Sequence, residues 1–295
     1  MTSIRSYAWI TIALLLASSL ILLFHLSTTN DEFSRYNVGW NGTSSFFSTL
    51  DRHTTTDVID PSGLAGYDNA TLVIIAPDYE MTPAEGALYR DYVLRGNTLL
   101  LADDSGSGNT LLRSLGSTIV IRQGNLTSVD QAYTDAHLIV VTPVRVARFF
   151  PMGSSLVLNR AATLTGGEPL LTTTIFSRMD ENPDKEQRSV AGVWGRYTVM
   201  AEEKIGNGTV YVLSDPSIFI NGMKDPGAPY ANGFFLHEIA HTPGPLLIDS
   251  FSSRTGRVDG VGEIIQLVRS NDTYQVMIAA LLMTGIVIAW NRRII

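Results

Sequence analysis

The sequence predicts an α/β fold: a three-layer sandwich on a mostly parallel sheet, with a β-rich insertion in the middle and two transmembrane helices. Three observations support this prediction. Continuous apolar runs, as long as buried strands, alternate with capped helical segments over residues 71–115. The same alternation returns over residues 197–249. Two uncharged apolar segments, residues 8–26 and 274–290, bracket the rest of the chain.

Each apolar segment has about the length that a helix needs to cross a hydrocarbon core of about 30 Å. Basic residues flank their outer ends, at Arg5, Arg292 and Arg293, and a Lys/Arg excess is typical of cytoplasmic flanks. A cleaved signal peptide is the alternative for the first segment, and a buried core helix for the second. The expected cell-membrane protein is double-pass, with cytoplasmic ends at residues 1–7 and 291–295, transmembrane helices at 8–26 and 274–290, and an external α/β domain at 27–273, β-rich at about 117–200.

The composition limits the chemistry. The chain has no cysteine, which excludes disulfides, thiolate metal sites and thiol nucleophiles. Its formal net charge is −7, and all 28 acidic residues lie between the two apolar segments. Such a surface should repel nucleic acid and anionic lipid. The expected partners are therefore membrane lipid, through the two spans, and another membrane or envelope protein, but not nucleic acid.

Asn-x-Thr triplets, the acceptor sequence for N-glycosylation, occur five times in the predicted external region. This is a mild excess for a chain rich in Ser and Thr, and it favours an external glycoprotein. The candidate sites are Asn41, Asn69, Asn125, Asn207 and Asn271.

The first part of the external region reads as alternating strands and helices. Thr82, Pro83 and Glu85 form a capping box with Pro at the first helical position, and Gly96 ends that helix. Short loops between such elements imply parallel pairing. In order, we expect a helix within 42–53, a strand at 58–59, a strand at 71–76, a helix at 83–95, a strand at 98–102, a turn at 103–108 and a helix at 109–115.

The middle of the chain is richer in short β-like runs, and the α/β pattern then returns. The middle is an insertion or an extension of the sheet, and Gly206-Asn207-Gly208 predicts a hairpin turn near its end. The expected strands are at 118–121, 138–141, 155–158, 170–175, 197–201, 209–213 and 246–249, with an exposed loop at 178–188 and helices at 230–241 and 263–269.

Three predicted strands end in acidic or polar turns. Because the carboxyl ends of parallel strands share one rim, where open α/β folds bind ligands, these side chains are a candidate binding site. The alternative is turn chemistry, since Asp and Ser side chains bond to nearby amides and cap the next helix. The Gly-rich turn at 103–108 lacks the Lys and the spacing of a phosphate loop, so no nucleotide is expected. The residues concerned are Asp78, Asp103, Asp104, Ser105 and Asp215.

A second motif is the string His237-Glu238-Ile239-Ala240-His241. On a helix, two His residues one turn apart can bind zinc while the Glu acts as general base on a bound water. The third ligand would have to be Glu263 or Asp249, and neither belongs to a recognisable second motif. The alternative is a helix face that carries two unligated His residues. We therefore expect no cofactor, with zinc as the alternative.

Residues 36–116 also carry a family resemblance. The stretches YNVGWNGTSSFFSTL and TLVIIAPDYEMTPAEGALYRDYVLRGNTLLLADDSGSGN, together with SDPSIFINGM at 214–223, resemble the family catalogued as domain of unknown function 4350. The resemblance covers roughly residues 33–250. It implies a class I glutamine-amidotransferase-like, or flavodoxin-like, α/β fold that is usually membrane-anchored. The closing segment adds Asn221 and Asn232 to the candidate binding rim.

True amidotransferases use a Cys nucleophile at a strand-to-helix elbow, and this chain has no Cys. The resemblance therefore implies a degenerate member without glutaminase activity and without catalytic residues. Three hypotheses follow. The first is a membrane-anchored, non-catalytic binding or scaffolding module outside the cell, the second a zinc metallopeptidase using the His-Glu-x-x-His string, and the third a purely structural envelope protein.

Overall fold

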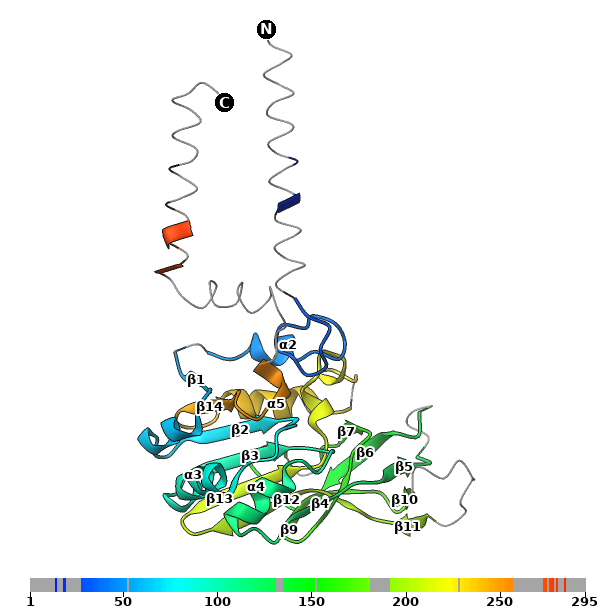
Figure 1. The fold of residues 1–295 in the computed structure, drawn as a ribbon. Helices are drawn as coiled ribbons and strands as arrows, with labels where there is room; N and C mark the ends of the chain where they lie inside the picture. The colour runs from blue at the N-terminus through cyan, green and yellow to red at the C-terminus, as the bar shows by residue number, and fades with distance from the viewer. Residues whose placement is uncertain are drawn as a thin grey trace. The chain divides into compact units, whose positions relative to one another are not determined.

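A computed structural model describes residues 28–51, 53–130, 135–151, 153–180, 192–227 and 229–256, and, nearer the ends, residues 14, 18, 19, 273, 274, 276–278, 280 and 284. The side chain of Asn125 is not described. The chain divides into two compact units: Met1–Asn30 with Val258–Ile295, and Asp31–Arg257. Both β-sheets lie in the second unit (Figure 1).

The larger sheet has eleven strands and is mixed. Five neighbouring strands are parallel, in the spatial order β1 (Thr55–Val58), β14 (Leu246–Asp249), β2 (Thr71–Ile75), β3 (Thr98–Ala102) and β13 (Gly208–Leu213). The sheet continues antiparallel through β12 (Thr198–Ile205), β9 (Glu168–Thr173), β6 (Leu138–Pro143) and β7 (Leu156–Asn159). A branch from β12 consists of β8 (Thr163–Thr165) and β4 (Val120–Arg122).

A separate small sheet has three antiparallel strands, in the order β11 (Val193–Gly195), β10 (Ser177–Asp180) and β5 (Asn125–Ser128). Residues 178–180 were expected in an exposed loop, and the structure places them in strand β10 instead. Figure 1 shows the small sheet at the end of the domain away from β1.

The predicted fold class is wrong. The sequence predicted a mostly parallel sheet with a separate β-rich insertion, but the middle of the chain extends the main sheet by antiparallel pairing. The physical reason is the hairpin at Gly206. Strands β12 and β13 pair antiparallel up to Ile205 and Gly208, so β12 presents an antiparallel edge to which β9 and β8 add. In the part of the chain that the structure describes, helices are few beside the eleven strands of this mixed sheet.

The predicted transmembrane helices are also absent from the residues that the structure describes, where no helix is long and apolar enough to cross a bilayer. Residues 8–26 and 274–290 lie almost wholly outside the described residues, as does the predicted helix at 263–269. The predicted membrane location and its orientation stay predictions.

Several local predictions are confirmed. Helix α3 (Pro83–Leu94) begins at a complete capping box, in which the Thr82 Oγ1 accepts from the Glu85 amide at 3.3 Å and the Glu85 carboxylate accepts from the Thr82 amide at 2.8 Å. Gly96 follows with φ +107°, which a residue with a side chain rarely adopts. Strands β3 and β14 and helix α4 (Asn109–Leu115) have the predicted bounds.

Helices cover both faces of the parallel strands. Leu72 and Ile74 of β2 belong to a core that also contains residues of α3 and α4. Val73 and Ile75, which alternate with them, belong to a second core that contains residues of the opposite layer. That layer comprises α2 (Ser44–Phe47), α5 (Asn232–Ala240) and the 3-10 turns η2 (Pro216–Phe219) and η3 (Asn221–Met223), while η1 (Pro61–Gly66) packs beside α3. Figure 1 shows α3 and α5 on opposite sides of the sheet.

Buried asparagine side chains complete the hydrogen bonding where the strands begin. Asn97 is fully buried. Its Oδ1 accepts from the Ala70 amide at 2.9 Å, and its Nδ2 donates to the carbonyls of Tyr67 at 3.0 Å and Tyr92 at 2.8 Å. One side chain therefore satisfies two buried backbone groups and one half-buried one.

The substitution Asn97→Asp should destabilise the fold strongly. A carboxylate cannot donate, so the buried Tyr92 carbonyl loses its partner, at a cost of about 1–3 kcal/mol, and the half-buried Tyr67 carbonyl loses one too. We expect the free energy of unfolding, measured by urea denaturation of the whole protein, to fall by at least about 2 kcal/mol. The control Asn207→Asp, in the exposed β12–β13 turn, should change it by no more than about 0.5 kcal/mol. Equal effects of the two substitutions would contradict this role for Asn97.

Candidate functional site

Three parallel strands end in the same kind of turn. Asp103 follows β3, Asp215 follows β13, and Asp249 is the last residue of β14. Each side chain is fully buried. Each carboxylate accepts a hydrogen bond from the backbone amide two residues further on, at 2.7–3.1 Å. The carboxylates that were expected to bind a ligand are therefore hydrogen-bonded to the turns that follow their strands.

The Asp103 carboxylate holds the Gly-rich turn before α4. Its Oδ1 accepts from the backbone amide of Ser105 at 2.8 Å and from the Ser105 hydroxyl at 2.6 Å. Its Oδ2 accepts from the amide of Gly108 at 2.8 Å. These bonds fix the turn that places the Ser105 and Ser107 hydroxyls 2.9 Å apart.

The Asp215 carboxylate joins two distant parts of the sheet. Its Oδ1 accepts from the Ser217 amide at 2.7 Å and its Oδ2 from the Asn159 amide, at the end of β7, at 2.6 Å. Burial and, to a smaller extent, the charge of Asp104 outweigh the hydrogen bonds from Asn159 and Ser217, and together these effects raise the pKa of Asp215 to about 7. Proton loss from this buried group is therefore unfavourable in the folded state.

Asp249 is a strand-end carboxylate that the sequence analysis considered only as a zinc ligand. It accepts from the amides of Phe251 and Ser252 and from the hydroxyls of Ser252 and Tyr89. Burial raises its pKa. The signal that could have placed it in the rim was visible, because an apolar run followed by Asp also occurs at Asp103.

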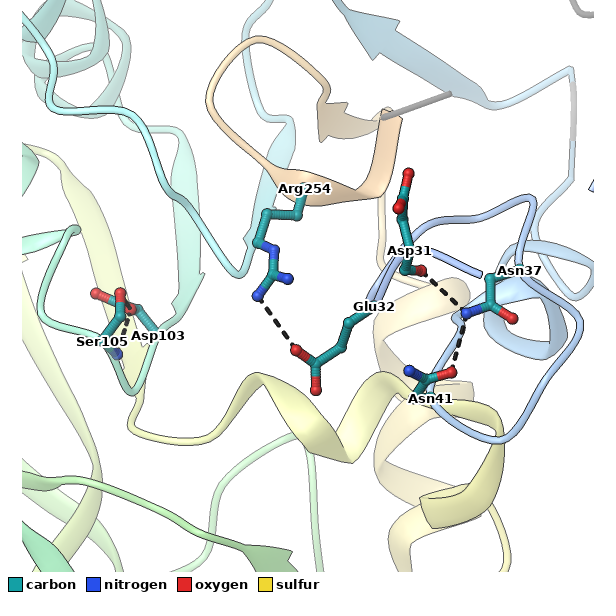
Figure 2. A network of polar contacts seen from close by, with 7 residues as sticks. All are labelled: Asp31, Glu32, Asn37, Asn41, Asp103, Ser105 and Arg254. Atoms are coloured by element: carbon teal, nitrogen blue, oxygen red, sulfur yellow. Dashed lines mark hydrogen bonds and ion pairs between the residues drawn. The ribbon is translucent and has the colours of Figure 1, made fainter. Parts of the chain in front are cut away.

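Asp104 has a different environment from these three. It is half-buried, and the charges of Glu32 and Arg254 affect its pKa. Burial and the neighbouring Asp103 raise the pKa of Asp104 to about 6, with a smaller rise from Glu32 and an opposing effect of Arg254. Arg254 pairs with Glu32 at 3.4 Å, and Figure 2 shows this pair near the Asp103 turn. The pair is solvent-accessible and contributes little stability.

The other predicted rim residues do not join this group. Asp78 is exposed at the end of the turn that follows β2. Asn221 binds the loop around Gly39, accepting from the Ser45 amide at 2.8 Å and donating to the Gly39 carbonyl at 2.6 Å. Figure 2 shows Asn37 of the same loop bonded to Asn41 and to the Asp31 carbonyl.

Asn232 is fully buried and lies against β7 rather than at the rim. Its side chain accepts from the Val157 amide at 2.9 Å and donates to the Val157 carbonyl at 2.9 Å, and it also donates to the Met223 carbonyl. The structure thus places Asp103, Asp104 and Asp215 near one another. Asn221 and Asn232 lie elsewhere and hydrogen-bond to the backbone.

A cleft of ≈ 910 Å³ lies beside the Asp103 turn. Its walls come from that turn, from the β4–β8 branch, from Met179 in the small sheet and from Tyr197. Apart from one acid, Glu80, and one base, Arg122, its polar groups are neutral hydroxyls and amides. Among them are Ser105, Ser107, Gln123, Thr163 and Thr165. Of these residues, sequence reasoning identified Ser105 alone, because the others are scattered over short strands that carry no common motif.

His237 and His241 stack at the end of α5. Their ring centroids are 4.0 Å apart, and the His241 Nδ1 lies 2.9 Å from the His237 carbonyl oxygen, which makes this nitrogen the donor. Within the described ranges, no group of three or more His, Cys, Asp or Glu side chains could hold a metal ion. Asp249 accepts hydrogen bonds from Ser252 and Tyr89, and Glu263 lies outside the described residues.

Comparison with known proteins adds the family. The model of the family described as "domain of unknown function (DUF4350)" matches residues 35–238. The chain belongs to this family. The amidotransferase-like fold and the membrane anchor that the resemblance implied are not confirmed by the match. The DUF4350 match ends at Glu238, so His241 lies beyond it. No curated protein sequence matches the chain.

Solved structures show only distant similarity to this DUF4350 protein. The "mmIFT52 N-terminal domain" is 18% identical, with a TM-score of 0.46 over 62% of this chain and 80% of that one. A β-galactosidase from Bacillus circulans sp. alkalophilus is 13% identical, with a TM-score of 0.39 over 59% of this chain and 24% of the enzyme. "Cytoplasmic Protein STM1381" from Salmonella typhimurium LT2 is 13% identical, with a TM-score of 0.37 over 66% and 81% of the two chains.

The predicted glycosylation positions have different surroundings in the DUF4350 fold. Asn69 and Asn207 are exposed, Asn69 with φ +50° and Asn207 in the β12–β13 turn. The Asn41 Oδ1 accepts from Asn37. The side chain of Asn125 and all of Asn271 lie outside the described residues. Glycosylation at these positions stays a prediction.

The stability of the DUF4350 domain should depend on the ionisation of Asp215. Its pKa rises from 3.8 to about 7 on folding, so its contribution to stability is complete at low pH and is lost as the pH rises through about 7. Asp215→Asn removes this titration. Between pH 4 and 8, the free energy of unfolding of the wild type should therefore fall relative to that of the variant, by up to about 1.4 kcal/mol per pH unit.

Asp60→Asn is the matched control for this titration. Asp60 caps η1 through the Ser62 amide at 2.9 Å, as Asp215 caps η2, but it is exposed and its hydrogen bonds lower its pKa. Its contribution should therefore be lost only as the pH falls below its ordinary value of 3.8. Parallel stability curves for the wild type and Asp215→Asn from pH 4 to 8 would contradict the assignment for Asp215.

Proposed function

We propose that this DUF4350 protein is a non-catalytic binding module whose ligand occupies the cleft beside the Asp103 turn. One contrast carries the proposal. The buried carboxylates at the strand ends are hydrogen-bonded to the turns, whereas Gln123 and Thr165 line an open cleft of ≈ 910 Å³. Concave sites with a few convergent polar groups are the usual ligand sites of proteins.

The strand ends offer little for catalysis. Asp103 and Asp215 hold backbone amides on both carboxylate oxygens, so a general base at either position would have to break the turn that presents it. The backbone at the end of β2 is strained, with φ +47° at Ala76, in the way that exposes a nucleophile in some hydrolases. Ala76 carries only a methyl group there. The chain also has no Cys that could act as a nucleophile at such a turn.

The lining favours a neutral ligand that is rich in hydroxyl groups, such as an oligosaccharide. Ser107, Thr165 and Gln123 can each donate and accept, which matches the dual character of sugar hydroxyls. Glu80 and Arg122 bring opposite charges, so the lining has no net preference for an ion. The Tyr197 ring and the apolar side chains nearby offer a surface for the C–H face of a sugar ring.

The absence of cysteine makes a direct test of occupancy simple. Gln123→Cys places one thiol on the exposed wall of the cleft, and Ala65→Cys places one on the exposed side of η1 as the matched control. A panel of defined neutral oligosaccharides is added, and the rate of alkylation by a maleimide is followed by mass spectrometry. We expect a binding oligosaccharide to slow alkylation of the Gln123→Cys protein at least severalfold and to leave that of the control unchanged.

Four outcomes would contradict the proposal. Protection of both thiols would indicate non-specific binding, and protection of Gln123→Cys only by peptides would indicate the wrong ligand class. No protection by any member of the panel, with wild-type thermal stability also unchanged by the same compounds, would favour the purely structural hypothesis. Amide or glycoside hydrolysis that is lost in Ser105→Ala would make the protein an enzyme.

A further inference from the structure

The loop that precedes α2 is fixed by hydrogen bonds. Within residues 37–42, which we call the Trp40 loop, the Oδ1 of Asn37 accepts from the Gly39 amide at 2.8 Å. From outside the loop, the Gly222 amide donates to the Trp40 carbonyl at 2.8 Å. These bonds hold the backbone of the loop in one conformation.

The Trp40 loop presents two apolar side chains to solvent. Trp40 is 70% exposed and Val38 is 62% exposed. Because the backbone is held by hydrogen bonds, the loop cannot fold back to bury these side chains against its own domain. Their apolar surface therefore stays in water unless something outside the domain covers it, and neighbouring exposed apolar groups are typical of binding surfaces.

The two ends of the domain meet at this loop. At the beginning of the domain, the Asp31 carbonyl accepts from the Asn37 side chain at 3.0 Å, as Figure 2 shows. At its other end, the Thr255 carbonyl accepts from the Arg35 amide at 2.9 Å. The chain therefore enters and leaves the domain beside the Trp40 loop.

The sequence beyond these ends indicates what covers the loop. Residues 8–26 and 274–290 are apolar and carry no formal charge, which is typical of segments that insert into a lipid bilayer. Only residues 27–30 separate the first segment from Asp31, so even an extended chain carries the end of that segment no further than about 18 Å from Asp31. A bilayer that holds the first segment is therefore within reach of the Trp40 loop.

We propose that the Trp40 loop docks onto the surface of a bilayer of zwitterionic lipid, with the Trp40 ring and the Val38 side chain among the headgroups. Trp suits this position because its ring is apolar while its N–H donates to a wet polar boundary. The lipid is zwitterionic because a chain of net charge −7 is repelled by an anionic surface. This docking rests on the predicted membrane location and is independent of the cleft.

The absence of cysteine lets a single dye report on the loop. Val38→Cys carries the dye in one full-length protein. Val193→Cys carries it in the matched control, a valine of similar exposure, 69%, in the small sheet, which Figure 1 shows away from α2. Both proteins are reconstituted with phosphatidylcholine vesicles, and quenching of the dye by lipids with a nitroxide on the headgroup is measured. We expect quenching at Val38→Cys to exceed that at Val193→Cys at least severalfold.

A second substitution tests the part played by the Trp40 ring. Adding Trp40→Ala to the Val38→Cys protein should lower the quenching at least severalfold, because the ring no longer holds the loop at the lipid surface. Unchanged circular dichroism and thermal midpoints confirm that the variants are folded. Equal quenching with and without the Trp40 ring would overturn its assignment to the headgroup region.

Flotation of the unsubstituted protein with the vesicles separates this docking from the predicted membrane location. If the protein floats but the Val38→Cys and Val193→Cys dyes are quenched equally, the docking is overturned and the membrane location stands. If the protein does not float, both are overturned. Quenching at Val38→Cys only in vesicles with phosphatidylglycerol would show that zwitterionic lipid is the wrong partner. A dimer in which the Val38→Cys dye is shielded from iodide in water, without quenching by lipid, would overturn the docking in favour of a second copy of the chain.

Discussion

The sheet closes back on itself at Ser214 and Asp215, and much of the domain depends on this contact. Strand β7 is the last strand in the order and β13 lies four places away, yet their ends are hydrogen-bonded. The Ala162 amide donates to the Ser214 carbonyl at 2.8 Å, the Ser214 hydroxyl donates to the Ala162 carbonyl at 2.8 Å, and the Asn159 amide donates to Asp215. The antiparallel half must therefore curve until its last strand meets the parallel half.

That curvature brings β7 to the layer of α5 and η2, where a free strand edge would be buried with unpaired amides. Side chains complete the hydrogen bonding in its place. Asn232 pairs with both backbone groups of Val157 as a neighbouring strand would, and Asn109 does the same for Ile121 at the edge of β4. An amide side chain suits this task because it donates and accepts from one planar group. Polar residues that resemble a binding site in the sequence are thus used to end the sheet.

The sequence predicted those parts whose cause is local. Strand β2 is buried on both faces, so its apolar run is continuous, and α3 carries its own start and stop signals at Thr82 and Gly96. The mixed sheet could not be predicted in this way. Strand β10 pairs with β5, about fifty residues earlier, through short polar sequences that resemble loops, and only the register of the whole sheet selects that pairing.

The same distinction explains why the candidate site was only partly visible. Asp103, Asp104 and Asp215 were recognised because each follows a strand, but the pattern cannot say whether a carboxylate faces a ligand or its own turn. Only the hydrogen bonds in the structure answer that question, and at Asp103 and Asp215 the carboxylates accept from backbone amides.

The division of the domain into two halves follows from these constraints. In the parallel half, helices cover both faces of the strands. The buried carboxylates at the strand ends accept hydrogen bonds from the amides of their turns. Most of the residues that line the cleft belong to 120–197 and come from the β4–β8 branch of the main sheet and from the separate small sheet. Short strands joined by turns can present side chains in this region without disturbing the core, because each strand is stabilised by the sheet with which it pairs. A binding role therefore fits the half of the molecule that the sequence pattern described least well.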